Sequence, residues 1–178
     1  MIGQFTCSFL PTAGSSRTDF NYCFFSRYLT SPALLYSTSI ERDLLSGTLI
    51  LADRYAFSGI AFSHAKGLPY EWCRSPEISL PAPDLTIFLD ISPEHARARG
   101  GYGEERYEKE EMQGRVREVF KRMGKEMGRV EVGETRWVGI DAGRSVEEVA
   151  NDIWNAISPL MHGLVRPLER LWTEGQSS

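Results

Sequence analysis

The chain has 178 residues, 42% of them hydrophobic and 25% charged, and its formal net charge is −4 at pH 7. These values are ordinary for one globular α/β domain, and the mild acidity gives no electrostatic footprint for nucleic-acid binding. No apolar stretch approaches the length that spans a bilayer, so the sequence predicts no membrane partner. The three cysteines, Cys7, Cys23 and Cys73, are widely spaced without metal-ligand spacing, which favours a reduced intracellular setting.

The N-terminal region contains one predicted strand and one ambiguous stretch. Residues 2–10 alternate apolar and polar side chains, which predicts a strand. Residues 11–19 are rich in Gly, Ser and Thr and indicate a loop. Residues 20–29 form an aromatic run without clean periodicity, which we interpret as a helix or as a disordered segment.

The apolar run of residues 48–52 ends abruptly in Asp53 and Arg54. Such a run predicts a buried strand, and open α/β sheets bind ligands at the carboxyl ends of their strands. An aspartate at this place is suited to hold Mg²⁺ or its waters, and an arginine offers a planar fork for a phosphate. The alternative is that Asp53 caps the next helix while Arg54 makes a surface ion pair.

Residues 85–90 predict a second strand that also ends in an acid, and Ser92 and Pro93 then indicate the start of a helix. The following residues, 97–108, combine three glycines with interleaved arginines and tyrosines. Glycines permit hinge motion and arginines can close over phosphates, so this segment is predicted to be a lid. The alternative is a solvated loop between two helices.

The C-terminal part of the chain predicts two helices and one strand. The first helix has an apolar stripe that indicates core rather than a cofactor site, formed by Met112, Val116, Val119, Phe120, Met123 and Met127. Residues 137–140 indicate the last strand. Ser145 and Glu148 form a predicted capping box, which opens a helix that carries Val149, Ile153, Trp154 and Ile157.

Several of these motifs together closely resemble thymidylate kinases of the eukaryotic type. They are Asp53-Arg-Tyr-Ala-Phe-Ser-Gly-Ile-Ala-Phe-Ser63, Trp72-Cys73, Leu80-Pro-Ala-Pro-Asp-Leu-Thr-Ile-Phe-Leu-Asp90 and Arg99-Gly-Gly-Tyr-Gly-Glu-Glu-Arg-Tyr-Glu108. The resemblance runs in order from about residue 40 to residue 172. It implies an α/β fold, a parallel sheet flanked by helices of the P-loop nucleoside monophosphate kinase type. It also implies transfer of the γ-phosphoryl group of ATP to dTMP with Mg²⁺.

The resemblance assigns roles to the residues that match the family's motifs. The catalytic residues would be Asp53, Arg54 and Arg99. The residues that would bind dTMP are Arg54, Ser58, Gly59, Phe62, Tyr107, Glu108 and Gln113. The ATP-binding residues would be Arg99, Asp141, Ala142 and Gly143, and the residues near the metal would be Asp53 and Glu108. The family also implies a homodimer, a cytoplasmic location and the nucleus as a second compartment.

Two family features are missing from the sequence. The phosphate-cradling loop, G-x-x-x-x-G-K-[ST], has no counterpart, because the Gly-Lys pair at residues 124–125 precedes Glu126 and lies within a helical pattern. In the family, a helix supplies an aromatic ring and an arginine to thymine. Residues 34–47 match the beginning and the end of this family segment, and its middle has no counterpart. Tyr36 approximates the aromatic residue, and the arginine has no confident equivalent.

These departures leave alternatives open for the chain. We divide it into an atypical N-terminal segment (1–39), a thymidylate kinase-like domain (40–172) and a polar tail (173–178). The N-terminal segment is either a divergent replacement or the sign of an incomplete chain with impaired activity. Because the missing loop follows a central strand, residues 2–10 are predicted to fill the resulting gap in the sheet. The alternative to an enzyme is a non-catalytic remnant that binds dTMP or a partner subunit.

Overall fold

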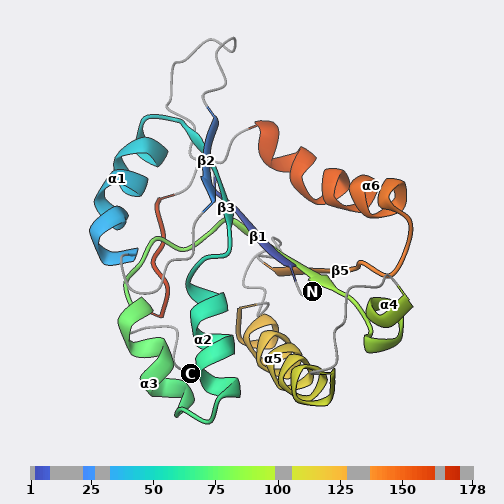
Figure 1. Cartoon of the computed structure of the whole chain (residues 1–178). Helices are drawn as coiled ribbons and strands as arrows, with labels where there is room; N and C mark the ends of the chain where they lie inside the picture. Colours follow the sequence, from blue (N-terminus) through green and yellow to red (C-terminus); the bar gives the residue numbers. More distant parts are fainter. Residues whose placement is uncertain are drawn as a thin grey trace.

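The protein is described here by a computed structural model, which covers residues 3–8, 22–26, 33–98, 106–127, 137–162 and 167–172. Five strands form one sheet, with helices on both of its faces (Figure 1). The strands are β1 (Gly3–Ser8), β2 (Tyr22–Ser26), β3 (Leu49–Asp53), β4 (Leu85–Asp90) and β5 (Trp137–Asp141). The helices are α1 (Ala33–Leu45), α2 (Ala56–Ala65), α3 (Tyr70–Arg74), α4 (Pro93–Ala98), α5 (Arg106–Met127) and α6 (Val146–Ile157). Short 3₁₀ helices are η1 (Ser75–Glu77) and η2 (Ser158–His162).

The strand order is β2-β3-β1-β4-β5, and β1 lies at the centre. This position confirms the prediction that residues 2–10 fill the gap in the sheet. β2 pairs parallel to β3 and β4 pairs parallel to β5, whereas β1 runs antiparallel to both of its neighbours. Four strands therefore share one direction, as the resemblance implied, and the central strand opposes them.

The interpretation of residues 20–29 as a helix or a disordered segment was wrong. Tyr22–Ser26 form β2, which pairs with β3 from Leu49 to Asp53. Aromatic residues favour strands, but a short apolar run cannot be assigned to strand or helix from periodicity alone. The parallel partner that decides the matter is supplied by a distant part of the chain.

Side chains of β4 and β5 point alternately to the two faces of the sheet. On one face, Phe88 joins the main core with Phe57 of α2 and Phe120 of α5, and the rings of Phe88 and Phe120 stack with centroids 4.9 Å apart. On the other face, Leu85, Ile87 and Ile140 pack against α6. The predicted core stripe of α5 is confirmed, since Val116, Val119, Phe120 and Met123 are buried and Met112 and Met127 pack beside them.

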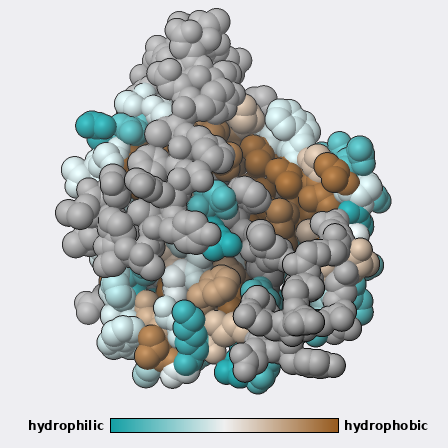
Figure 2. Space-filling view, in the orientation of Figure 1, coloured by the Kyte–Doolittle hydropathy of each residue, from teal (hydrophilic) through white to brown (hydrophobic). Residues whose placement is uncertain are grey.

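The face under α6 is covered more thinly than the face under α2 and α5. No residue of α6 is buried, and Trp154 is 60% exposed. Hydrophobic surface is visible beside this helix (Figure 2). The predicted capping box at the start of α6 is confirmed: the Ser145 hydroxyl accepts from the Glu148 N–H, and the Glu148 carboxylate accepts from the Ser145 N–H.

Candidate active site

Three aspartates end three strands that run in the same direction. Asp53 is the last residue of β3, Asp90 of β4 and Asp141 of β5. Asp90 and Asp141 are paired neighbours in the parallel register of β4 and β5. Because the carboxyl ends of parallel strands share one edge of a sheet, these acids mark the edge at which ligands of α/β folds bind.

Arg54 occupies a conformation that is unusual for a residue with a side chain. Its φ is 64°, in the left-handed region, directly after β3. Such strained backbone costs on the order of 1–3 kcal/mol and is concentrated at functional sites. The turn brings the Arg54 guanidinium to 5.9 Å from the centre of the Phe62 ring on α2. The structure thus brings together two of the residues predicted to bind dTMP.

The first turn of α2 is held by Tyr55 rather than by Asp53. Tyr55 is the N-cap residue, its carbonyl oxygen accepts from the Ser58 N–H at 3.1 Å, and its hydroxyl donates to the Pro81 carbonyl oxygen at 3.1 Å. The alternative in which Asp53 caps this helix is therefore wrong. The Asp53 carboxylate is positioned by the end of β3.

Gly59, one turn into α2, faces Glu77 of η1. A Cβ atom at Gly59 would lie 3.8 Å from Glu77 Oε1. Glu77 is 8% exposed, and its Oε2 has no hydrogen-bond partner. Burial raises the pKa of the Glu77 carboxyl from 4.5 to about 7. Sequence reasoning missed this residue, although an acid embedded in an apolar, proline-rich stretch was a visible signal.

Helix α5 carries three of the predicted site residues, and the structure describes one of their side chains. Gln113 has a buried amide oxygen, Oε1, without a hydrogen-bond partner. Tyr107 and Glu108 lie in the first turn of α5, but their side chains fall outside the described part of the molecule. Arg99 also lies outside the described residues, so the lid stays a prediction.

The residues predicted to contact adenine form the turn after β5. The Gly143 N–H donates to Asp141 Oδ1 at 2.8 Å, and the Ala142 N–H donates to the Asp90 carbonyl oxygen at 2.7 Å. A Cβ atom at Gly143 would lie 2.5 Å from His95 Nδ1, so the close approach of this imidazole requires glycine. These contacts fix the turn to the end of β4.

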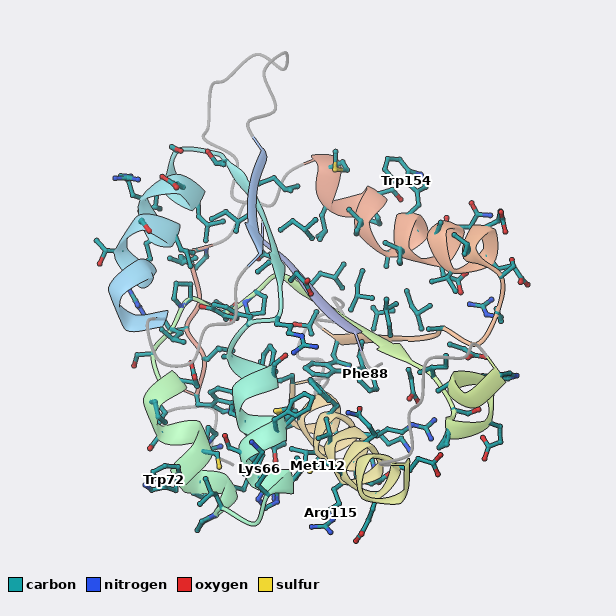
Figure 3. The ribbon with its side chains drawn as sticks, viewed as in Figure 1. Lys66, Trp72, Phe88, Met112, Arg115 and Trp154 are labelled. Atoms are coloured by element: carbon teal, nitrogen blue, oxygen red, sulfur yellow. The ribbon has the colours of Figure 1, made fainter. Side chains whose placement is uncertain are left out.

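A pocket of about 600 Å³ lies next to this turn, between β4, β5, α4 and α5. Asp90, His95, Arg117, Trp137 and Asp141 are among its lining residues. Phe88, which also lines the pocket, lies between β4 and α5 (Figure 3). Within it, Arg117 donates to both oxygens of Asp90, from Nε at 2.6 Å and from Nη2 at 2.7 Å. The sequence placed Asp90 at a strand end but gave no signal for its partner.

The direction of β1 decides what can be built beside Asp53. Gly3 at the start of β1 pairs with Leu89, near the end of β4, whereas Ser8 at the end of β1 pairs with Ile50, near the start of β3. A phosphate loop joins the carboxyl end of a strand to a helix. Because the carboxyl end of β1 is at the opposite edge from Asp53, this strand does not lead into such a loop at the candidate site.

The carboxylates at this edge are suited to one role in Mg²⁺ binding. Within the described parts of the chain, no three His, Cys, Asp or Glu side chains form a group that could hold a metal ion alone. Mg²⁺ is commonly held by one or two carboxylates together with substrate phosphates. Asp53 fits that arrangement as a single carboxylate.

Among the described helices, none is long and apolar enough to cross a membrane.

Comparisons with known proteins place this chain in a family. A sequence model of the family described as "Thymidylate kinase" matches residues 17–153. The chain is 50% identical over 119 residues to a thymidylate kinase of Schizosaccharomyces pombe, covering 67% of this chain and 55% of that protein. It is 42% identical over 136 residues to a thymidylate kinase of Arabidopsis thaliana, covering 75% of this chain and 48% of that protein.

A solved structure shows a similar fold. A thymidylate kinase from Candida albicans is 27% identical, with a TM-score of 0.59, and the match covers 78% of this chain and 68% of that one. The chain spans about half the length of the first curated relatives it matches.

Proposed function

Because the chain belongs to the thymidylate kinase family, a family of nucleotide phosphotransferases with the P-loop fold, we propose that it binds dTMP and transfers the γ-phosphoryl group of ATP to it. We further propose that the rate is strongly reduced because the sequence lacks a phosphate loop. The observation that carries the proposal is Arg54: its left-handed backbone aims a guanidinium from the end of β3 at the ring of Phe62.

The acceptor half of the site supplies complementary chemistry for a nucleoside monophosphate. A guanidinium binds a phosphate through two parallel hydrogen bonds, and Phe62 offers an aromatic face beside it. The unpartnered amide oxygen of Gln113 is an acceptor that an imide N–H, such as that of thymine, would satisfy. Ser58, Gly59, Tyr107 and Glu108 complete the proposed dTMP-binding set.

The donor half would use Arg99 on the phosphates of ATP and residues 141–143 against adenine. Asp53 and Glu108 would hold Mg²⁺, which when bound would neutralise the transferring phosphates. Phosphoryl transfer depends on positioning and electrostatic stabilisation, so each missing donor costs rate. Loss of the loop's backbone N–H groups and lysine is expected to reduce turnover on the order of a hundredfold or more for each donor lost. A homodimer, and cytoplasmic and nuclear locations, belong to the same proposal.

A coupled assay of ADP release tests the proposal, with dTMP and millimolar Mg²⁺-ATP. We expect slow turnover that depends on dTMP and disappears in Arg54→Ala. The matched control is Arg42→Ala, since Arg42 is an exposed arginine that pairs with its neighbour Asp43. Turnover that survives in Arg54→Ala would contradict the assignment of Arg54.

The reversed β1 favours a second candidate function, a non-catalytic protein that binds dTMP or a partner subunit. Isothermal titration with dTMP in the absence of ATP separates the two candidates. Binding of dTMP that Arg54→Ala abolishes, without any ADP release, supports the second function. Absence of both dTMP binding and turnover would overturn the kinase function and the dTMP-binding form of the second function.

A further inference from the structure

Helix α5 is attached to the sheet by an apolar stripe and by one two-point ion pair. The stripe, which includes Val116, Phe120 and Met123, is buried against the main core. Arg117 reaches in addition to the last residue of β4, where its Nε and Nη2 donate to the two oxygens of Asp90. An apolar stripe allows small sliding and rotation, whereas a planar fork on a carboxylate fixes direction as well as distance.

This pair is better shielded from water than its counterparts on the same helix. The side chains of Arg117 and Asp90 are 29% and 23% exposed. The pair of Lys121 and Glu118, one turn further on, has side chains that are 43% and 71% exposed. Exposed pairs contribute little because water screens them, and shielding makes the Arg117–Asp90 contact stronger. Arg117 also neutralises an acid that lies next to Asp141 in the register of the sheet.

The position of Arg117 along α5 connects the pair to the acceptor site. Arg117 is four residues after Gln113, and residues four apart on a helix lie on the same face. In the part of α5 whose side chains the structure describes, Gln113 has a buried amide oxygen without a partner. A helix held at Arg117 therefore presents Gln113 in one rotation and at one height relative to the carboxyl edge of the sheet.

We propose that Arg117 is a positioning residue for the acceptor nucleotide: through its two-point contact with Asp90, it holds α5 in the register that presents Gln113 to the bound base. This inference rests on the proposed function, because it assumes that dTMP is bound between α2 and α5. Arg117 itself does not contact the nucleotide. Its effect passes through the helix.

The first test is the affinity for dTMP of Arg117→Lys and Arg117→Gln, measured by isothermal titration beside urea unfolding of the same variants. Lysine keeps the charge but loses the fork, so dTMP binding is expected to weaken roughly tenfold while the unfolding midpoint stays close to that of the wild type. The control is Lys121→Gln, which removes the exposed pair on the same helix and should change the dissociation constant less than twofold. Unchanged affinity in Arg117→Lys and Arg117→Gln would overturn the inference.

A charge-reversed pair tests whether the contact itself matters. Asp90→Arg alone and Arg117→Asp alone should each weaken dTMP binding more than Arg117→Lys does. The double variant Asp90→Arg/Arg117→Asp should recover most of the loss, since the two groups can pair again. If the double variant binds no better than the single variants, the pair does not set the register.

Hydrogen exchange in the free protein separates this inference from the proposed function. Arg117→Gln should increase the exchange rate of backbone amides around residues 110–117 at least severalfold, and Lys121→Gln should not. A wild-type protein that does not bind dTMP would refute the proposed function, and faster exchange in Arg117→Gln would then still support the register. Equal exchange rates in the wild type and Arg117→Gln would refute the proposal that Arg117 holds the register of α5, whether or not the protein binds dTMP.

Discussion

The two halves of the carboxyl edge differ in how completely they are built. On the β3 side, Arg54 and Phe62 offer a guanidinium and an aromatic face, and Gln113 on α5, the helix packed against α2, carries an unpartnered acceptor. On the β1 side, the central strand restores the pairing of β3 and β4 but runs in the opposite direction. β1 therefore completes the sheet without supplying a phosphate-binding loop. Strands can pair in either direction, whereas a phosphate loop must follow the carboxyl end of a strand at the ligand-binding edge.

The largest expected effect comes from breaking the strand that joins the two halves. Thr6 pairs with Ala52 on one side and Thr86 on the other. Thr6→Pro removes a backbone donor from a central strand, so we expect a loss of about 3 kcal/mol or more in the free energy of unfolding. Urea unfolding followed by circular dichroism measures it. Phe24→Pro in β2, whose one neighbour among the described strands is β3, should cost less, and an equal cost would show that β1 is not the centre of the fold.

The next effect concerns the acceptor half of the site, where the buried Glu77 is expected to make the stability of the protein depend on pH. Its pKa is about 7 in the folded protein and 4.5 as the ordinary value, so the folded state binds the proton more tightly. Stability contributed by this protonation is present below pH 4.5 and is lost as the pH rises through 7. The loss corresponds to at most about 3 to 4 kcal/mol.

Glu77→Gln removes this titration, so the variant should be more stable than the wild type at pH 8 and should differ less from it at pH 5. Thermal unfolding at both pH values measures the difference. The control is Glu118→Gln, which changes an exposed carboxylate. A wild type whose stability relative to Glu77→Gln is the same at both pH values would show that Glu77 is not a buried, protonated acid.

The smallest effect tests whether the start of α6, after β5, is independent of dTMP binding. Ser145→Ala removes the side-chain acceptor of the capping box that opens α6. We expect a loss of about 1 kcal/mol in stability and no change in affinity for dTMP. Thermal unfolding and titration with dTMP check the two expectations. Weaker dTMP binding in Ser145→Ala would mean that the two halves are coupled.

The sequence predicts local structure well where one segment carries the whole signal. Strands that end in Asp53 and Asp90 and the capping box at Ser145 depend on neighbouring residues, and all are found. It fails where the deciding partner is distant. Nothing local distinguishes β2 from a helix, gives the direction of β1, or pairs Arg117 with Asp90, 27 residues away.

The same reasoning applies to the candidate site. The motif around Asp53 and Arg54 predicts which residue types lie at the edge of the sheet. It does so because the motif is continuous in the chain and covers the end of β3 and the start of α2. The left-handed backbone of Arg54 and the burial of Glu77 arise from packing by other elements, and no spacing in the sequence reports them.

The place of β1 also governs the order in which this protein can fold. β1 precedes the other strands in the described part of the chain, yet Phe5 pairs with both Asp53 and Ile87. Its ladders close only after both later strands have been synthesised, whereas β2 and β3 are separated by a shorter stretch of chain. Contacts between distant residues slow folding and leave strand edges unprotected meanwhile. Until β4 has been synthesised, β1 therefore has at least one edge unpaired, and an unpaired strand edge is a template for pairing with another chain.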